Sequence, residues 1–167
     1  LCSGNRANTS IDSVGWEVPG PGEFVPGYGY HVTKSHNIAT DNVDLLTVTG
    51  KVAIMLMTGE VTTVVATTTT YQLRVKTTAE AITAATTITT DAAGTIYIVS
   101  GDAGDVMNGA DAPVVRVGSS GKYNPFVLGL TGGSLTVESD LDAAGTGVIR
   151  WDVYYIPLEA GASVVAA

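Results

Sequence analysis

The stretch from Gly147 to Leu158, which reads G-V-I-R-W-D-V-Y-Y-I-P-L, limits the possible folds of this chain more than any other. Apolar side chains recur in it at every second position: Ile149, Trp151, Val153 and Tyr155. This period of two places them on one face of an extended strand and fits a helix poorly. Pro157 has no backbone N–H to donate, which suits the exit from a sheet. We therefore expect a β-strand, buried on one side, that closes a β-sandwich.

The opposite face of this strand is mixed in character. Arg150 and Asp152 lie on it together with Val148, Tyr154 and Ile156. A strand face that is turned only to water is usually polar, and this one is not. We therefore expect a neighbouring subunit to cover part of the face and Tyr154 to take part in that contact.

The composition also favours strands. Threonine, with 23 copies, and valine, with 22, are the commonest residues, and both are β-branched. Charged residues make up 14% of the chain, against about 25% in an ordinary soluble domain. Threonine, serine, asparagine and glycine must therefore supply much of the polar surface. A length of 167 residues fits one domain, or one domain with an arm.

Short candidate strands follow one another from residue 29 onward, separated by turn residues. We expect them at Gly29–Thr33, Val43–Thr49, Lys51–Thr58, Val61–Ala66, Thr70–Lys76, Thr86–Thr90, Gly94–Ser100, Val114–Val117, Phe126–Leu128, Ser134–Glu138 and Gly147–Leu158. So many strands with one long loop, over Gly101–Pro113, fit a jelly roll better than a meander. The sequence therefore predicts an all-β, jelly-roll β-sandwich over residues 29–167.

The candidate strand Lys51–Thr58 is apolar on both faces. Strict alternation places Val52, Ile54 and Leu56 on one side, and Ala53, Met55 and Met57 on the other. A strand of this kind is covered twice, once by its own core and once by something else. We expect Met55 and Met57 to contact an arm or a partner subunit.

Residues 1–28 differ from the rest of the chain. They include V-P-G-P-G-E-F-V-P-G-Y, which forms no helix and no central strand. We expect an extended Pro/Gly-rich arm whose aromatic side chains anchor it to a partner, since buried aromatic residues often dominate binding energy. The proposed anchors are Trp16, Phe24 and Tyr28, with Tyr30 just beyond the arm. A disordered leader is the alternative.

The charge balance argues against two classes of partner. The net charge is −8 and the isoelectric point about 4.4, so nucleic acid and anionic membranes should repel the chain. No run of 18 apolar residues is present to span a membrane. Cys2 is the sole cysteine, so no intramolecular disulfide can form.

No motif for catalysis or cofactor binding stands out. His31 and His36 have no third ligand at metal-binding spacing, and a structural or surface role is the better interpretation. There is no G-x-S-x-G and no phosphate-binding loop. We expect a protein that is not an enzyme and needs no cofactor.

One acidic loop leaves a metal hypothesis open. Residues 100–111 gather Asp102, Asp105, Asn108 and Asp111, whose oxygens are of the type that calcium prefers. The loop lacks the spacing and the final glutamate of an EF-hand. A solvated acidic loop is therefore the simpler interpretation.

Three segments together resemble small jelly-roll structural proteins of tailed bacteriophages, of the capsid decoration or cement type. They are K-V-A-I-M-L-M-T-G-E-V-T-T-V-V-A-T from Lys51, D-A-A-G-T-I-Y from Asp91 and G-V-I-R-W-D-V-Y-Y-I-P-L-E-A-G-A-S-V from Gly147. The resemblance covers roughly residues 43–164 and leaves residues 1–42 unmatched. It implies homotrimers, a place in the virion and no enzymatic activity. In such proteins an N-terminal arm commonly attaches the module to its particle.

Two functions follow as expectations. The first is a cement protein on the virion's capsid surface, which trimerises and binds the major capsid protein or another virion protein to stabilise the capsid. The alternative is a fibre or tail module that binds a host-surface receptor or glycan. Tyr123 and Asn124 are the cluster that best suits a glycan site, although a tight turn explains them equally well.

Overall fold

The computed structural model describes residues 22, 24–25, 27–66, 69–99 and 125–167 of the chain. This part of the chain contains ten strands and no helix, and every strand pairing is antiparallel. The all-β prediction is therefore confirmed. The strands are β1 (Phe24–Val25), β2 (Gly29–Asn37), β3 (Asp44–Thr63), β4 (Thr70–Val75), β5 (Glu80–Ala81), β6 (Thr86–Thr87), β7 (Ile96–Ile98), β8 (Phe126–Leu141), β9 (Val148–Pro157) and β10 (Ser163–Ala166).

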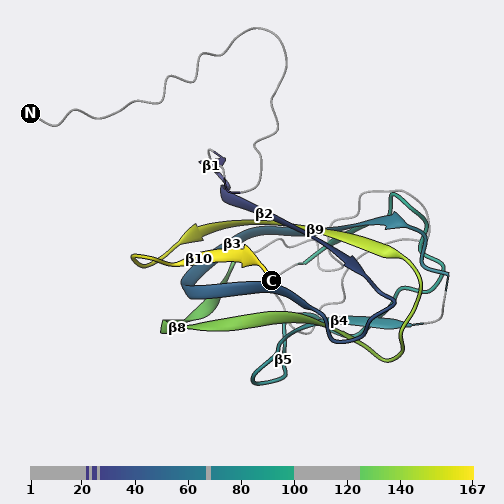
Figure 1. Ribbon diagram of the computed structural model, residues 1–167. Helices are drawn as coiled ribbons and strands as arrows, with labels where there is room; N and C mark the ends of the chain where they lie inside the picture. The colour runs from purple at the N-terminus through teal and green to yellow at the C-terminus, as the bar shows by residue number, and fades with distance from the viewer. Residues whose placement is uncertain (1–21, 23, 26, 67–68, 100–124) are drawn as a thin grey trace, which may run out of the picture.

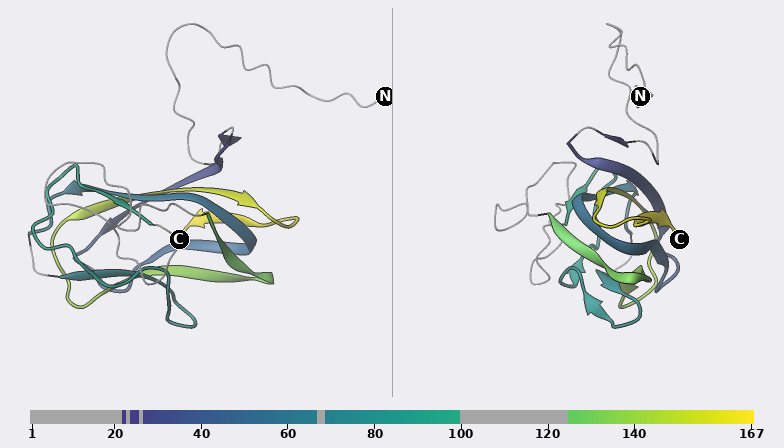
Figure 2. Two further views of the ribbon diagram at one scale, coloured as in Figure 1. Left: turned by 180° about the vertical axis from the view of Figure 1, so that it is seen from behind. Right: turned by 90° about the vertical axis from the view of Figure 1, so that its left-hand side faces the viewer.

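The strands form two layers that share β3 (Figure 1). The first half of β3 pairs with β8 on one edge and with β10 on the other. The second half pairs with β9 and β7. One layer therefore has the order β10–β3–β8–β4–β5, and the other has the order β2–β9–β3–β7. The end-on view in Figure 2 shows that the layers curve round a common interior.

The long strand β3 replaces three shorter strands that the sequence predicts. Gly50, expected to end a strand, lies within β3 and has a φ of 64°. The pairing with β8 shifts register there, from Ser134 opposite Thr49 to Gly129 opposite Lys51. A Cβ atom at this position would lie 2.6 Å from Glu159 Oε1 and 3.0 Å from Ala162 Cβ. Only glycine fits both this φ and this space.

A β-bulge in β3 overturns the predicted faces of Lys51–Thr58. Ile54 lies opposite Tyr155 and Leu56 lies opposite Tyr154, so Met55 is the extra residue between them. Beyond the bulge the inward positions shift by one. Met57 therefore lies in the core and is 1% exposed, whereas Leu56 is half-buried.

The closing strand β9 supplies the centre of the core. Ile149, Trp151, Val153 and Tyr155 are all buried, as the alternating pattern predicts. Trp151 lies between two buried tyrosines, with ring centroids 5.8 Å from Tyr71 and 6.4 Å from Tyr97. Aromatic pairs at this separation add to the gain from burial.

A buried polar chain fixes the position of these rings. Trp151 Nε1 donates to the Tyr71 hydroxyl at 3.1 Å, and His36 Nδ1 lies 3.0 Å from the same oxygen. His36 Nε2 lies 3.3 Å from the carbonyl oxygen of Thr40, which can only accept. The proton of the neutral ring is therefore on Nε2, and Nδ1 accepts from Tyr71. Burial lowers the pKa of His36 and raises that of Tyr71, which favours the neutral form of each.

Candidate functional site

The β1–β2 hairpin is held directly against the end of β9. Phe24 lies opposite Tyr30 and Val25 opposite Gly29, and the next pairing joins Tyr30 to Tyr155 of β9. A Cβ atom at Gly29 would lie 2.1 Å from the carbonyl oxygen of Tyr155, and the φ of Gly29 is 88°. The hairpin can therefore take this position only with glycine there.

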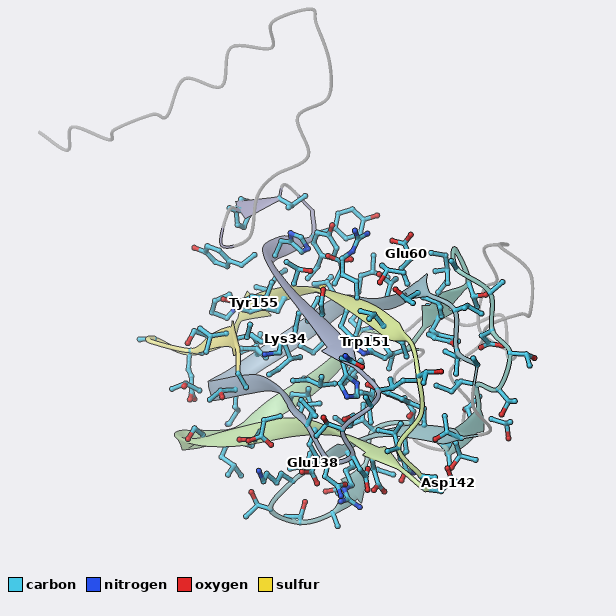
Figure 3. All side chains as sticks on the ribbon, turned by 45° about the vertical axis from the view of Figure 1, so that its right-hand side comes forward. Lys34, Glu60, Glu138, Asp142, Trp151 and Tyr155 are labelled. Carbon is cyan, nitrogen blue, oxygen red and sulfur yellow. The ribbon has the colours of Figure 1, made fainter. Side chains whose placement is uncertain are left out.

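This pairing places two aromatic pairs around the hairpin, here together called the aromatic surface. Phe24 and Tyr30 lie on the side of β2 that carries Tyr155, and Tyr28 and Tyr154 lie on the opposite, outer face. Phe24 packs edge-on against Tyr30 at 5.6 Å, and Tyr28 packs edge-on against Tyr154 at 5.9 Å. Phe24, Tyr28 and Tyr30 are 60%, 49% and 37% exposed. Beneath the hairpin, the buried ring of Tyr155 contacts Tyr30 and joins the surface to the core (Figure 3).

His31 supports the surface from below. Its ring stacks on Tyr154 with a centroid distance of 4.6 Å and an angle of 15° between the planes. Its Nε2 donates to Asp152 Oδ1 at 2.9 Å, while its Nδ1 is buried without a hydrogen-bond partner. Burial and the nearby Asp152 carboxylate raise the pKa of Tyr154, so its phenol stays neutral. His31 thus fixes the orientation of Tyr154.

A row of charged side chains continues from His31 across the outer face of β9 and β3. Asp152 Oδ2 accepts from Arg150 Nε at 3.1 Å, and Arg150 Nη2 donates to Glu60 Oε2 at 2.6 Å. Glu60 lies at the far end of this row, away from Tyr155 (Figure 3). The charges are therefore paired with one another. Because these charges satisfy one another, the exposed aromatic rings are the main groups left on the outer face of β9 to bind a partner.

The structure places four of the seven residues that the sequence predicts for partner binding around the β1–β2 hairpin. They form two pairs, Phe24 with Tyr30 and Tyr28 with Tyr154, on opposite faces of the β2–β9 pairing. Met55 is half-buried on β3, and Met57 is buried within its own chain and cannot meet a partner. Trp16 lies outside the described residues.

The other predicted positions carry no site within the described part of the chain. His31 and His36 both have structural roles. Asp102, Asp105, Asn108, Asp111, Tyr123 and Asn124 lie outside the described residues. Among the residues that are described, no group of three or more His, Cys, Asp or Glu could hold a metal ion. The same residues include no helix that is long and apolar enough to cross a membrane.

Comparisons with protein families, with curated proteins and with solved structures find no match to this chain. The proposed function therefore rests on the geometry of the aromatic surface.

Sequence reasoning placed Tyr155 on the buried face but missed its contact with Tyr30, and it missed the charged row from Glu60 to His31. The row depends on pairing between strands that are far apart in the chain, because Arg150 is opposite Glu60 and Asp152 is opposite Thr58. Alternation of Arg150 and Asp152 on one face was the available signal. It identified the face but not its partners.

Proposed function

We propose that this protein is a non-enzymatic virion structural protein of the capsid decoration type, which forms homotrimers and binds the capsid surface. The observation that carries the proposal is the aromatic surface, where three exposed rings surround the β1–β2 hairpin and one of them, Tyr28, packs on Tyr154. Large rings bury much apolar area at a low cost in side-chain entropy, and they are enriched in binding hot spots.

The paired charges beside the surface support a protein partner. Arg150, Asp152 and Glu60 already satisfy one another, so covering them leaves no unpaired charge. Rigid rings next to neutralised charges are typical of the centre and the rim of a protein interface. The major capsid protein, or another virion protein, is the proposed partner.

The strand order supports a jelly roll as the finer description of the fold. When the two halves of β3 are counted separately, one layer has the order β2, β9, second half of β3, β7. The other has the order first half of β3, β8, β4, β5. With β10 taken as an addition at the edge of the second layer, these eight strand segments form two four-stranded layers, and the first and last of the eight, β2 and β9, are adjacent. This order fits the double Greek key of viral jelly rolls.

The experiment is co-sedimentation of the purified full chain with the virus particles. Phe24→Ser combined with Tyr28→Ser should remove most of the binding and leave the fold intact, since both side chains are exposed. Val64→Ser is the matched control, because Val64 is an exposed apolar residue at the end of β3. Deletion of residues 1–28 should likewise abolish binding. If the double variant and the truncated chain still decorate particles, the proposal is wrong.

One observation favours the alternative, a fibre or tail module that binds a host glycan. Tyr28 and Tyr154 lie beside Arg150 and Asp152 on the same face, and rings next to polar groups also suit sugars. A glycan array distinguishes the two functions. Specific glycan binding that Tyr154→Ala abolishes, together with no binding to capsids, would favour the fibre module.

A further inference from the structure

A second surface lies on the opposite side of the sandwich from the β1–β2 hairpin (Figures 1 and 2). It is a groove of about 360 Å³ between the first part of β8 and the turn that leads from β4 into β5. Its lining is mainly apolar and includes Val75, Ile82, Val127, Leu130 and Leu135. Val127 and Leu130 are 61% and 56% exposed.

The floor of the groove is a strand edge that has no partner among the described residues. β4 pairs with β8 only from Val137 to Leu141, and a last backbone bond runs from Lys76 to Thr136 at 2.9 Å. Beyond that point the chain turns away into β5. Within the described ranges, no strand pairs with the outer edge of β8 from Phe126 to Gly129, whose other edge pairs with β3. Residues 130–133 then bulge out of the ladder, because Gly129 is opposite Lys51 and Ser134 is opposite Thr49. The outward backbone N–H and C=O groups of this edge can pair with an extended backbone.

The edge Phe126–Gly129 is short and apolar. Exposed edges are usually blunted by charged residues or proline within the strand. Phe126–Gly129, which reads F-V-L-G, contains neither, and the bulge over residues 130–133 ends it. An apolar, uncharged edge beside a groove is the arrangement to which peptides add as an extra strand.

The other wall of the groove indicates which peptide fits. Glu80 is exposed on that wall, and its carboxylate has no ion pair or hydrogen bond among the described residues. The chain as a whole carries a net charge of −8. A basic side chain in the bound segment would complement both. The turn over residues 77–82 forms the wall of the groove opposite β8. The groove therefore has room for a single extended segment and not for the edge of a second sheet.

We propose that this groove binds an extended segment of a partner protein, with apolar side chains on one face and a lysine or arginine next to Glu80. The segment pairs with Phe126–Gly129 of β8, an edge that no described strand covers. This inference goes beyond the aromatic surface and does not depend on it. Together the two surfaces would give the protein partners on opposite sides, which a protein that bridges neighbouring molecules requires.

The test is a titration of the ¹⁵N-labelled full chain, followed by NMR. The probe is a short acetylated peptide in which valine and threonine alternate around a central lysine. Amide signals of residues 126–135 and 77–82 should shift, and those of Tyr28 and Tyr154 should not. The same peptide with proline in place of two valines should cause no shifts, because proline has no N–H to donate.

Two variants test the details. Val127→Lys, at an exposed site that should tolerate the change, should weaken binding by placing a charge on the edge. Glu80→Lys should lower affinity for the lysine peptide by about threefold and raise affinity for the matched glutamate peptide. The proposal is overturned if the lysine peptide shifts no β8 amides at millimolar concentration, if the proline peptide binds equally well, or if the two variants leave binding unchanged.

Discussion

Gly59 lies opposite Trp151 where β3 pairs with β9, and the indole ring covers its backbone. A Cβ atom at Gly59 would lie 2.9 Å from two ring carbons of Trp151, closer than carbon atoms normally approach. Gly59→Ala should therefore destabilise the fold by about 1–3 kcal/mol through overpacking, measured by urea unfolding. Gly133→Ala is the control, because its nearest neighbour is the exposed side chain of Leu130. Equal stability of the two variants would show that the packing of the Trp151 ring does not require glycine at position 59.

The buried His36 should make stability depend on pH. In the folded state, burial lowers the pKa of His36 below its ordinary value of 6.5. As the pH falls, the unfolded chain therefore takes up a proton on this histidine before the folded chain does. Stability should be unaffected by His36 above about pH 7 and should decrease as the pH falls through about 6 toward the lowered folded pKa. His36→Gln should flatten this part of the profile of melting temperature against pH. An unchanged slope in the variant would assign the dependence to other groups.

A carboxylate contributes in a separate pH range. Hydrogen bonds from Thr70 and Thr69 lower the pKa of Asp142 below 3.8. The stability that it supplies is present above that value and is lost as the pH falls through the lowered folded pKa. The effects of His36 and Asp142 can therefore be separated in one titration.

At the scale of elements, the bulge in β3 distinguishes two methionines that a regular strand would treat alike. Met57 is buried in the core, and Met55 is half-buried at the bulge. Met57→Ala should cost about 2–5 kcal/mol, and Met55→Ala should cost less than about 1 kcal/mol. Urea unfolding of the pair measures both. Similar losses would mean that both side chains share one face and that the bulge is absent.

The same element shows why sequence reasoning succeeded for β9 and failed for β3. β9 keeps one register along its length with β2, so a simple period of two identified its buried face. β3 changes partners along its length, and its register shifts at Leu45, Gly50, Met55 and Thr62. These shifts are set by the neighbouring strands, which the local pattern of β3 does not reveal. Gly50 looked like a strand end for the same reason, since only its neighbours show that it is a bend.

The candidate site was predictable in its residue types and not in its grouping. Phe24, Tyr28 and Tyr30 were recognisable as anchors because they are aromatic residues among prolines and glycines. The contacts of Tyr28 with Tyr154 and of Tyr30 with Tyr155, both more than a hundred residues away in the chain, result from the pairing of β2 with β9. No local pattern encodes that pairing.

At the scale of the whole molecule, the proposed trimer should depend on the outer face of β9. Sedimentation equilibrium should give a mass three times the chain mass of 17.1 kDa. Tyr154→Lys should lower that mass, because it places a charge where a neighbouring subunit is expected to pack. Val64→Lys, at an exposed position at the end of β3, is the control. A variant that remains a full trimer of unchanged stability would remove Tyr154 from the interface.

The central claim is that this chain decorates a capsid, and its copy number in purified virus particles tests that claim most directly. Quantitative mass spectrometry of the particles gives the ratio of this chain to the major capsid protein. A decoration protein should be present at a copy number comparable with that of the major capsid protein, because it covers the whole surface. A ratio of a few per cent or less would contradict the account and would place the chain in a fibre or tail.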